Sequence, residues 1–524
     1  MMSPRVGIVS GLALVATLVA ALVGLAPRVV AGVAATAGHS QPAPRARTPA
    51  VNPAPGTGGD APAPTLAGEQ RLSHGRFGEV MVYRPAGKPS SVALFISGDG
   101  GWNLGVVDMA RHLLSMNAAV VGIDIRRYLK AVNRPGESCQ YFGADFEGLS
   151  HDVQQRLRLD DYLPPVLIGY SSGATLAYAV LVQSPKGTFV GAMSLGFCPD
   201  LDVTQKICKG SGLDYQVHYG KPQAGAAAAA PVQGVLFSPA RSNVTPWVAF
   251  QGDIDQVCDP AGTRKFVAAT GSAELVWLPK VGHGFSVERN WLPQFKAAYA
   301  KLAARAAPPR VSVPAVADLP LVEVPATAAP QAQERELFAV LLTGDGGWAG
   351  IDQDVAAALA AHGIPVIGLD TLKYFWHERT PETAAADLER IVQRYAIEWQ
   401  RRQVLLVGYS FGADVLPFLY TRLAADVRRQ VRTVNLLGLS DTAAFEFHVS
   451  DWVPGAGGAG RPTAPEIRRM QDASVLCVYG ESESDSPCPR LTGAHLRAVA
   501  LGGGHHFGGD YEALARSIVE YGRR

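Results

Sequence analysis

A pentapeptide with a serine at its centre occurs twice in this chain of 524 residues and constrains its fold more than any other feature. The copies span residues 169–173 (GYSSG) and 408–412 (GYSFG), and each follows a short apolar run. A strand that ends in Gly-x-Ser-x-Gly and leads into a helix forms a nucleophile elbow, a tight turn that exposes the serine hydroxyl. Glycines on both sides let the strand and the helix approach closely. The two copies therefore predict two serine nucleophiles, Ser171 and Ser410.

The pentapeptides belong to a longer internal repeat. A Gly-Asp-Gly-Gly-Trp loop follows an apolar run at 94–102 and again at 340–348. A Val-x-Gly-x-Asp segment follows at 120–124 and at 366–370. Because a repeat of this length corresponds to a whole structural unit, it predicts two related domains.

Short apolar runs alternate with helical patterns in both copies, which predicts parallel sheets with both faces covered. The fold class is therefore α/β, with two tandem α/β-hydrolase domains, each a mostly parallel sheet covered by helices on both faces. The expected strands of the first domain are 92–97, 119–124, 166–170, 191–196, 247–251 and 274–278. Those of the second are 321–324, 338–343, 365–370, 404–409, 433–439, 475–479 and 496–501.

The N-terminus has the pattern of an export signal. Arg5 precedes an apolar stretch over 6–25, and small residues at 35–37 offer a cleavage site. The stretch is also long enough for an uncleaved membrane anchor. We expect a periplasmic protein, exported and either released or anchored in the inner membrane. The expected segments are a signal or anchor (1–37), a Pro/Ala/Gly-rich tether (38–68), an N-terminal domain (69–302), a linker (303–320) and a C-terminal domain (321–524).

Six cysteines divide evenly around the expected linker, four before it and two after it. Even numbers in an exported chain favour disulfides, with buried free thiols as the alternative. The pairings with short loops are Cys477–Cys488 and Cys198–Cys208, which leaves Cys139 for Cys258.

Each serine is followed by an acid and a histidine in the chain order of α/β-hydrolases. The histidine takes the serine proton and the acid orients the histidine. The expected triads are Ser171, Asp255 and His283 in the first domain, and Ser410, Asp485 and His505 in the second. In both, a cysteine stands three residues after the acid. Asp253, Glu483 and His506 compete for these roles.

The Gly-Asp-Gly-Gly-Trp loops follow the strand that normally delivers an oxyanion hole. The residues expected to contribute are Gly98, Asp99 and Ser172 in the first domain, and Gly344, Asp345 and Phe411 in the second. The alternative is a turn whose aspartate caps a helix.

Paired cations and aromatic residues predict substrate contacts near the mouths of the sites. Arg127 with Tyr128 and Lys373 with Tyr374 occupy equivalent positions, and a cation there could hold a phosphate or carboxylate. Trp348 is a candidate for a pocket wall. No spacing calls for a metal or cofactor, and the net charge of +1 argues against nucleic acid as a partner.

The segments 343–348, 408–414 and 504–507 resemble those of the VirJ/AcvB-type bacterial virulence proteins. The resemblance implies a periplasmic hydrolase that cleaves the aminoacyl ester of lysyl- or alanyl-phosphatidylglycerol at the membrane surface. It would make Ser410 the nucleophile, Asp485 the acid and His505 the base. In the first domain, Ser172 replaces Phe411 and Thr175 replaces Asp414, which departs from the family pattern.

Two alternatives compete with this function. One is a general periplasmic carboxylesterase for small soluble esters. The other is a non-catalytic hydrolase-fold partner of a virulence or secretion system, which fold alone does not exclude. An exposed apolar rim around the Ser410 pocket would favour a lipid substrate, and a small closed pocket would favour a soluble ester.

Overall fold

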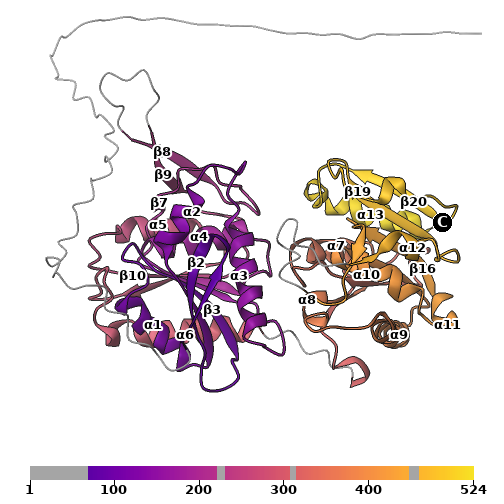
Figure 1. The fold of residues 1–524 in the computed structure, drawn as a ribbon, viewed down its shortest axis with the longest axis horizontal. Coiled ribbons are helices and arrows are strands. Elements are labelled where there is room, and N and C mark those ends of the chain that lie inside the picture. The colour runs from indigo at the N-terminus through magenta and orange to yellow at the C-terminus, as the bar shows by residue number, and fades with distance from the viewer. Residues whose placement is uncertain (1–68, 221–230, 307–313, 448–459, 524) are drawn as a thin grey trace, which may run out of the picture. The chain divides into compact units, whose positions relative to one another are not determined.

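The computed structural model describes residues 69–220, 231–306, 314–447 and 460–523. These residues belong to one compact unit that contains two large sheets (Figure 1). The expected signal or anchor and the tether lie outside the described residues, as does part of the expected linker. Within the described ranges, no helix combines the length and apolar character needed to cross a bilayer.

The first sheet has eight strands in the order β1-β2-β4-β3-β5-β6-β10-β11. The six strands from β4 to β11 in this order are parallel, and β1 and β2 form an antiparallel hairpin at the edge. All six expected strands are present, whereas the hairpin was not expected. The strands are β1 (Glu69–His74), β2 (Gly78–Tyr83), β3 (Ser91–Ile96), β4 (Ala118–Ile123), β5 (Val166–Tyr170), β6 (Gly191–Leu195), β10 (Trp247–Gly252) and β11 (Ala273–Leu278).

Helices cover both faces of this sheet (Figure 1). Along β3, Phe95 packs with α1 (Leu104–Leu114) and α6 (Leu292–Ala303), while its neighbour Leu94 packs on the opposite face. Successive side chains of a strand point to opposite faces, so a strand covered on both sides is apolar throughout. The helices on the Leu94 face are α2 (Ile125–Val132), α3 (Phe142–Arg156), α4 (Ser172–Gln183) and α5 (Pro260–Ala269).

The second sheet repeats this plan with seven strands in the order β12-β14-β13-β15-β16-β19-β20. Only the edge strand β12 is antiparallel to its neighbour. All seven expected strands are present. They are β12 (Leu321–Val324), β13 (Leu337–Leu342), β14 (Val366–Leu369), β15 (Gln403–Tyr409), β16 (Val431–Leu437), β19 (Val475–Gly480) and β20 (Leu496–Leu501).

The second sheet is also covered on both faces. One face packs against α7 (Gly350–Ala361) and α13 (Tyr511–Gly522), and the other against α9 (Pro381–Glu398), α10 (Phe411–Tyr420) and α12 (Thr463–Ile467). The predicted fold class is thus confirmed. Besides short 3-10 helices, the remaining elements are α8 (Thr371–Tyr374), α11 (Ala425–Arg428), the small sheet β7 (Asp200–Leu201), β8 (Tyr215–Tyr219), β9 (Val232–Phe237), and the pair β17 (Thr442–Ala443), β18 (Arg461–Pro462).

All six cysteines form disulfides, but two of the three predicted pairings are wrong. The bonds are Cys139–Cys208, Cys198–Cys258 and Cys477–Cys488. Cys198 and Cys258 follow β6 and β10, which are neighbours in the sheet. Residues next to Cys139 and Cys208 meet in a β-bridge. Strand order, rather than distance along the chain, therefore selects the partners.

Candidate active sites

Both serines lie at the sharp turn that the pentapeptides predict. Ser171 has φ 56° and ψ −124°, and Ser410 has φ 51° and ψ −118°. These backbone angles are unfavourable for a residue with a side chain and persist only where the surroundings enforce them. A Cβ at Gly173 would lie 2.3 Å from the Ser97 carbonyl oxygen, so only glycine fits between the helix and the neighbouring strand end.

The first expected triad is assembled. His283 Nε2 lies 2.9 Å from Ser171 Oγ, and His283 Nδ1 lies 2.9 Å from Asp255 Oδ2. The Asp255 side chain has no exposed surface. Burial alone would raise the pKa of Asp255, but the hydrogen bonds from His283 and from the backbone N–H of Cys258 together hold it below its usual value. The carboxylate therefore stays ionised and can orient the imidazole.

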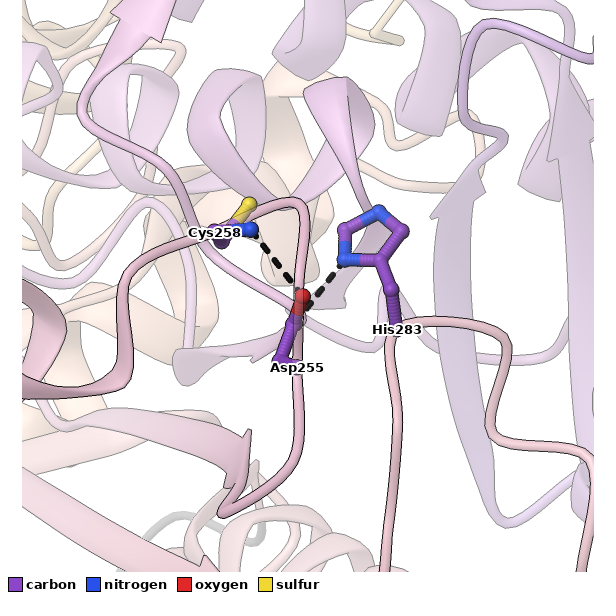
Figure 2. A group of neighbouring side chains, drawn as sticks. All are labelled: Asp255, Cys258 and His283. Atoms are coloured by element: carbon purple, nitrogen blue, oxygen red, sulfur yellow. Dashed lines mark hydrogen bonds and ion pairs between the residues drawn. The ribbon is translucent and has the colours of Figure 1, made fainter. Parts of the chain in front are cut away.

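Asp255, His283 and Cys258 lie close enough together to raise the question of a metal site (Figure 2). However, the Cys258 sulfur is bonded to Cys198 and offers no thiolate, the form that binds metals. Figure 2 shows Asp255 between the backbone nitrogen of Cys258 and the His283 ring. The donor set therefore fits a hydrogen-bonded triad better than a metal centre.

The second site is also assembled, but with a different acid from the one predicted. His505 Nε2 lies 2.9 Å from Ser410 Oγ, and His505 Nδ1 lies 2.5 Å from Glu483 Oε1. The other oxygen of Glu483 accepts the N–H of Gly480, 2.6 Å away. Asp485 is exposed, and its backbone carbonyl accepts a hydrogen bond from Arg490. The structure thus replaces Asp485 by Glu483.

The error comes from the choice of register between the two domains. Asp255 and Glu483 each stand three residues after the glycine that ends a strand, Gly252 and Gly480. The prediction instead placed each acid three residues before a cysteine. Cys258 follows Asp255 by three residues, but Cys488 follows Glu483 by five. The longer glutamate side chain reaches the histidine from the same position.

The other competing residues have different contacts. Asp253 accepts the backbone N–H of Lys280 at 2.7 Å and so fixes a turn. The ring of His506 stands edge-on to that of His505, with centroids 6.2 Å apart. Burial, together with the neighbouring His505, lowers the pKa of His506.

The glycine-rich loops lie beside both nucleophiles. A Cβ at Gly98 would lie 3.0 Å from Ser171 Cβ, and one at Gly344 would lie 3.5 Å from Ser410 Cβ. The N–H of Gly344 donates to Asp352 Oδ1 at 3.2 Å, which directs this amide away from an oxyanion role. Asp345 and Phe411 remain the predicted donors of the second site.

In the first domain, the predicted oxyanion residues contact one another. Ser172 Oγ donates to Asp99 Oδ1 at 2.6 Å and ties the glycine-rich loop to the start of α4. At the position of Ser172, the second domain has Phe411, which packs on Phe375 with ring centroids 5.3 Å apart. The departure from the family pattern thus replaces an aromatic contact with a hydrogen bond.

The predicted substrate contacts are mostly structural. Tyr128 is fully buried and donates to Asp145, and Tyr374 is buried and donates to Asp387, so neither can reach a substrate. Both tyrosines lie on short helices that turn their rings into the core.

The predicted cations and the tryptophan also have partners away from the nucleophiles. Arg127 pairs with Glu79 at 3.7 Å, and Lys373 pairs with Asp370 at 3.2 Å. The Trp348 ring lies against Gly368 of β14, where a Cβ would approach it to 2.0 Å. The assignments of Tyr128 and Tyr374 are therefore corrected, whereas those of Arg127, Lys373 and Trp348 stay predictions.

Sequence reasoning missed the residues that hold the histidines. The hydroxyls of Tyr170 and Tyr409, in the pentapeptides themselves, donate to the backbone carbonyls of His283 and His505. The repeated tyrosine was a signal for this role. Each imidazole also packs on a glycine with positive φ after the next strand, Gly196 or Gly438.

The second domain's Asp414 and the first domain's Thr175 perform equivalent tasks. Asp414 accepts the N–H of Ser440 at 2.7 Å, and Thr175 donates to the carbonyl of Cys198. Both bonds join the helix after the nucleophile to the loop after the next strand. The exchange of Asp for Thr therefore leaves the first site intact.

The second site opens into a cavity of about 780 Å³. Ser410, His505 and Asp345 line it, together with Glu147 and Lys186 of the first domain. Burial raises the pKa of Glu147 to about 8, and the charge of Asp345 adds to this effect. The cavity thus holds the carboxyl groups of Glu147 and Asp345 alongside the ammonium of Lys186, which pairs with Asp354 at 2.6 Å.

The chain is similar to several solved structures, each at low identity. The esterase domain of a Rhodothermus marinus protein is 16% identical over 44% of this chain and 97% of that one, with a TM-score of 0.30. Est1E from Butyrivibrio proteoclasticus is 11% identical over 45% and 99%, with a TM-score of 0.30. The Xanthomonas campestris protein XC6422, an α/β serine hydrolase without a lid, is 17% identical over 48% and 99%, with a TM-score of 0.29. No curated protein sequence matches significantly.

A family model described as bacterial virulence protein (VirJ) matches residues 90–195 and 336–524. The two regions make up more than half of the chain. The first includes the Ser171 elbow, and the second includes the whole Ser410 triad. The chain belongs to the VirJ family of bacterial virulence proteins.

Proposed function

We propose that this hydrolase cleaves the aminoacyl ester of aminoacyl-phosphatidylglycerol at Ser410. The observation that carries the proposal is the assembled Ser410–His505–Glu483 triad within the region matched by the family. In this reaction Ser410 Oγ attacks the ester carbonyl while His505 Nε2 takes its proton. The same proton then passes to the glycerol oxygen as the C–O bond breaks. Water releases the amino acid from the acyl-enzyme by the reverse sequence.

The carboxylates of the cavity support an aminoacyl substrate. The ammonium group of an aminoacyl ester lies one carbon from the carbonyl, so it would enter the cavity with the reacting group. Asp345 lines the cavity, and beside it Glu147, whose pKa is raised to about 8 by burial, is mostly protonated near pH 7. A bound cation would also lower the pKa of Glu147 and ionise it, which strengthens the attraction.

An exported location agrees with the disulfides. All six cysteines are paired, as expected in an oxidising compartment such as the periplasm. The outer face of the inner membrane, where the lipid substrate would be accessible, belongs to this compartment. The location is part of the proposal.

The test is release of amino acid from lysyl- and alanyl-phosphatidylglycerol in mixed micelles. Ser171→Ala and Ser410→Ala form a matched pair, since each removes one nucleophile. We expect Ser410→Ala to lose at least about 10⁴-fold in rate and Ser171→Ala to retain most of it. If the wild-type protein releases no amino acid from either lipid, or if Ser410→Ala remains active, the proposal fails.

A further inference from the structure

Two loops of the first site expose large hydrophobic side chains to solvent. The exposed fractions are 58% for Ile254, 61% for Val257 and 42% for Val287. Ile254 directly precedes Asp255, and the backbone N–H of Val257 donates to the Asp255 carboxylate. Val287 stands four residues after His283. Figure 2 shows the two loops side by side at Asp255 and His283.

The second domain serves as an internal comparison. In the register of the strand-end glycines, Ser482 replaces Ile254 and Asp485 replaces Val257. In the register of the histidines, Gly509 replaces Val287. All three apolar positions are therefore polar or glycine around Ser410. Among the described residues of the second domain, Ile397 on α9 is the large hydrophobic residue that stands out as exposed, and it lies on neither of these loops.

The exposed apolar side chains bear on the sequence criterion that an apolar rim around a site favours a lipid substrate. One exposed apolar side chain, Val244 at 64%, lines the cavity at Ser410, whereas three lie on the loops that carry Asp255 and His283. A solvated apolar surface costs free energy, so three such residues beside one triad point to a ligand that covers them. Since the same loops carry Asp255 and His283, a ligand bound at Ser171 would lie beside them.

We propose that Ser171 is the nucleophile of a second esterase site, which takes esters of aliphatic carboxylic acids. Ile254, Val257 and Val287 contact the aliphatic chain. This inference rests on the proposed serine-hydrolase chemistry, but not on an aminoacyl substrate at Ser410.

The reaction needs no further reactant besides water. Ser171 Oγ bonds to the acyl carbon as His283 Nε2 accepts the hydroxyl proton. The ester C–O bond then breaks, and the departing alcohol oxygen takes that proton from His283. Water attacks the acyl-enzyme, gives a proton to His283, and releases the fatty acid as the proton returns to Ser171. Asp255 holds the imidazole in place throughout.

The experiment isolates the Ser171 site in the Ser410→Ala variant. Its kcat/KM is measured on p-nitrophenyl acetate, butyrate and octanoate below their critical micelle concentrations. Full burial of one methylene changes binding by about fourfold, and a half-open rim covers only part of a chain. We expect at least a tenfold rise from acetate to octanoate. No rise, or no hydrolysis of any of these esters, would overturn the inference.

Two further variants identify the rim as the cause. Replacing Ile254, Val257 and Val287 by serine in the Ser410→Ala protein should lower the octanoate-to-acetate ratio at least fivefold. Rates are normalised to the fraction of Ser171 labelled by a fluorophosphonate, which separates folding from specificity. Ile397→Ser, another exposed isoleucine, is the matched control and should leave the ratio unchanged. If the rim variant keeps the ratio, or if Ser171→Ala shows the same chain-length preference, the inference is wrong.

The same proteins distinguish a membrane lipid from a soluble ester as the source of the chain. Dioctanoylphosphatidylglycerol is supplied as monomers and as micelles to the Ser410→Ala variant. A higher rate on micelles assigns a lipid surface, and an equal rate assigns soluble esters. Failure to cleave the lipid at all, combined with a flat p-nitrophenyl series, contradicts both. Aminoacyl-lipid hydrolysis at Ser410 is tested separately, in the Ser171→Ala variant. A negative result for aliphatic esters at Ser171 therefore leaves the proposed function of Ser410 unaffected, and the reverse also holds.

Discussion

The replacement of Asp485 by Glu483 as the orienting acid can be tested with a pair of isosteric substitutions. The Ser171→Ala background removes the serine of the other elbow, so that ester hydrolysis there reports on the Ser410 site. Glu483 accepts two hydrogen bonds, one from His505 and one from the N–H of Gly480. Glutamine offers one oxygen and one NH₂ group, so in Glu483→Gln one of the two donors meets another donor. The imidazole then loses the tautomer in which Nε2 can accept the serine proton.

The size of the loss follows from the exposure of the histidine. Loss of the acid from a buried triad costs about 10⁴-fold in kcat, or about 5 kcal/mol. The His505 side chain is 39% exposed, compared with 15% for His283. Water can therefore replace part of the carboxylate's effect, and we expect about 10³-fold for Glu483→Gln. Asp485→Asn should stay within a few-fold of its parent.

The assay compares initial rates on p-nitrophenyl acetate and on lysyl-phosphatidylglycerol. Because the acid acts on the transition state, kcat should fall while KM changes little. A large loss in Asp485→Asn together with near-parental activity in Glu483→Gln would refute the assignment. Equal small losses in both variants would refute the role of an acid at this position.

Three further predictions concern the supports of the two sites. Replacing Cys198 and Cys258 together by serine should lower the free energy of unfolding by about 4 kcal/mol, because the bond closes a loop of 60 residues; urea titration measures this, and an unchanged midpoint would contradict it. The free energy of unfolding lost in Asp255→Asn should be constant above about pH 4 and shrink below it. The pKa of Asp255 is lowered in the folded state, so its contribution to stability disappears as the pH falls through that folded pKa. Equal losses of unfolding free energy at pH 6 and pH 3 would speak against this. Asp352→Ala should reduce kcat at Ser410 about tenfold, because it releases the Gly344 loop. Asp352→Asn should preserve kcat, because burial raises the pKa of Asp352 and a neutral acceptor already suits the site. Equal kinetics of the two variants would exclude this role of Asp352.

The strands and the positions of both elbow serines could be predicted because their signals are local. Strands buried on both faces are continuously apolar, so β3 and β15 are visible in the sequence alone. The elbow serines are bracketed by glycines that no other residue can replace without a clash. The edge hairpin of β1 and β2 escaped prediction because its first strand is polar apart from Leu72 and is half-exposed, so it lacks the apolar run that marks the other strands.

The candidate sites were predictable in residue type but only partly in identity. A histidine after Gly and before x-Phe was sufficient to select His283 and His505 over His506. The predicted substrate contacts of Tyr128 and Tyr374 failed because equivalent positions in a repeat also include core residues. Sequence spacing carries no information about which face of a short helix meets the sheet.

The sequence by itself determined the two-domain α/β plan, the two serines and their histidines, because each depends on a pattern within a few residues. Only the tertiary structure decided between Glu483 and Asp485, since the choice depends on which side chain reaches His505 from the end of a neighbouring strand. The same is true of the disulfides, where adjacent strands bring Cys198 to Cys258 across 60 residues. Contacts between strand ends are fixed by the order of strands in the sheet, and that order is set by packing of the whole domain.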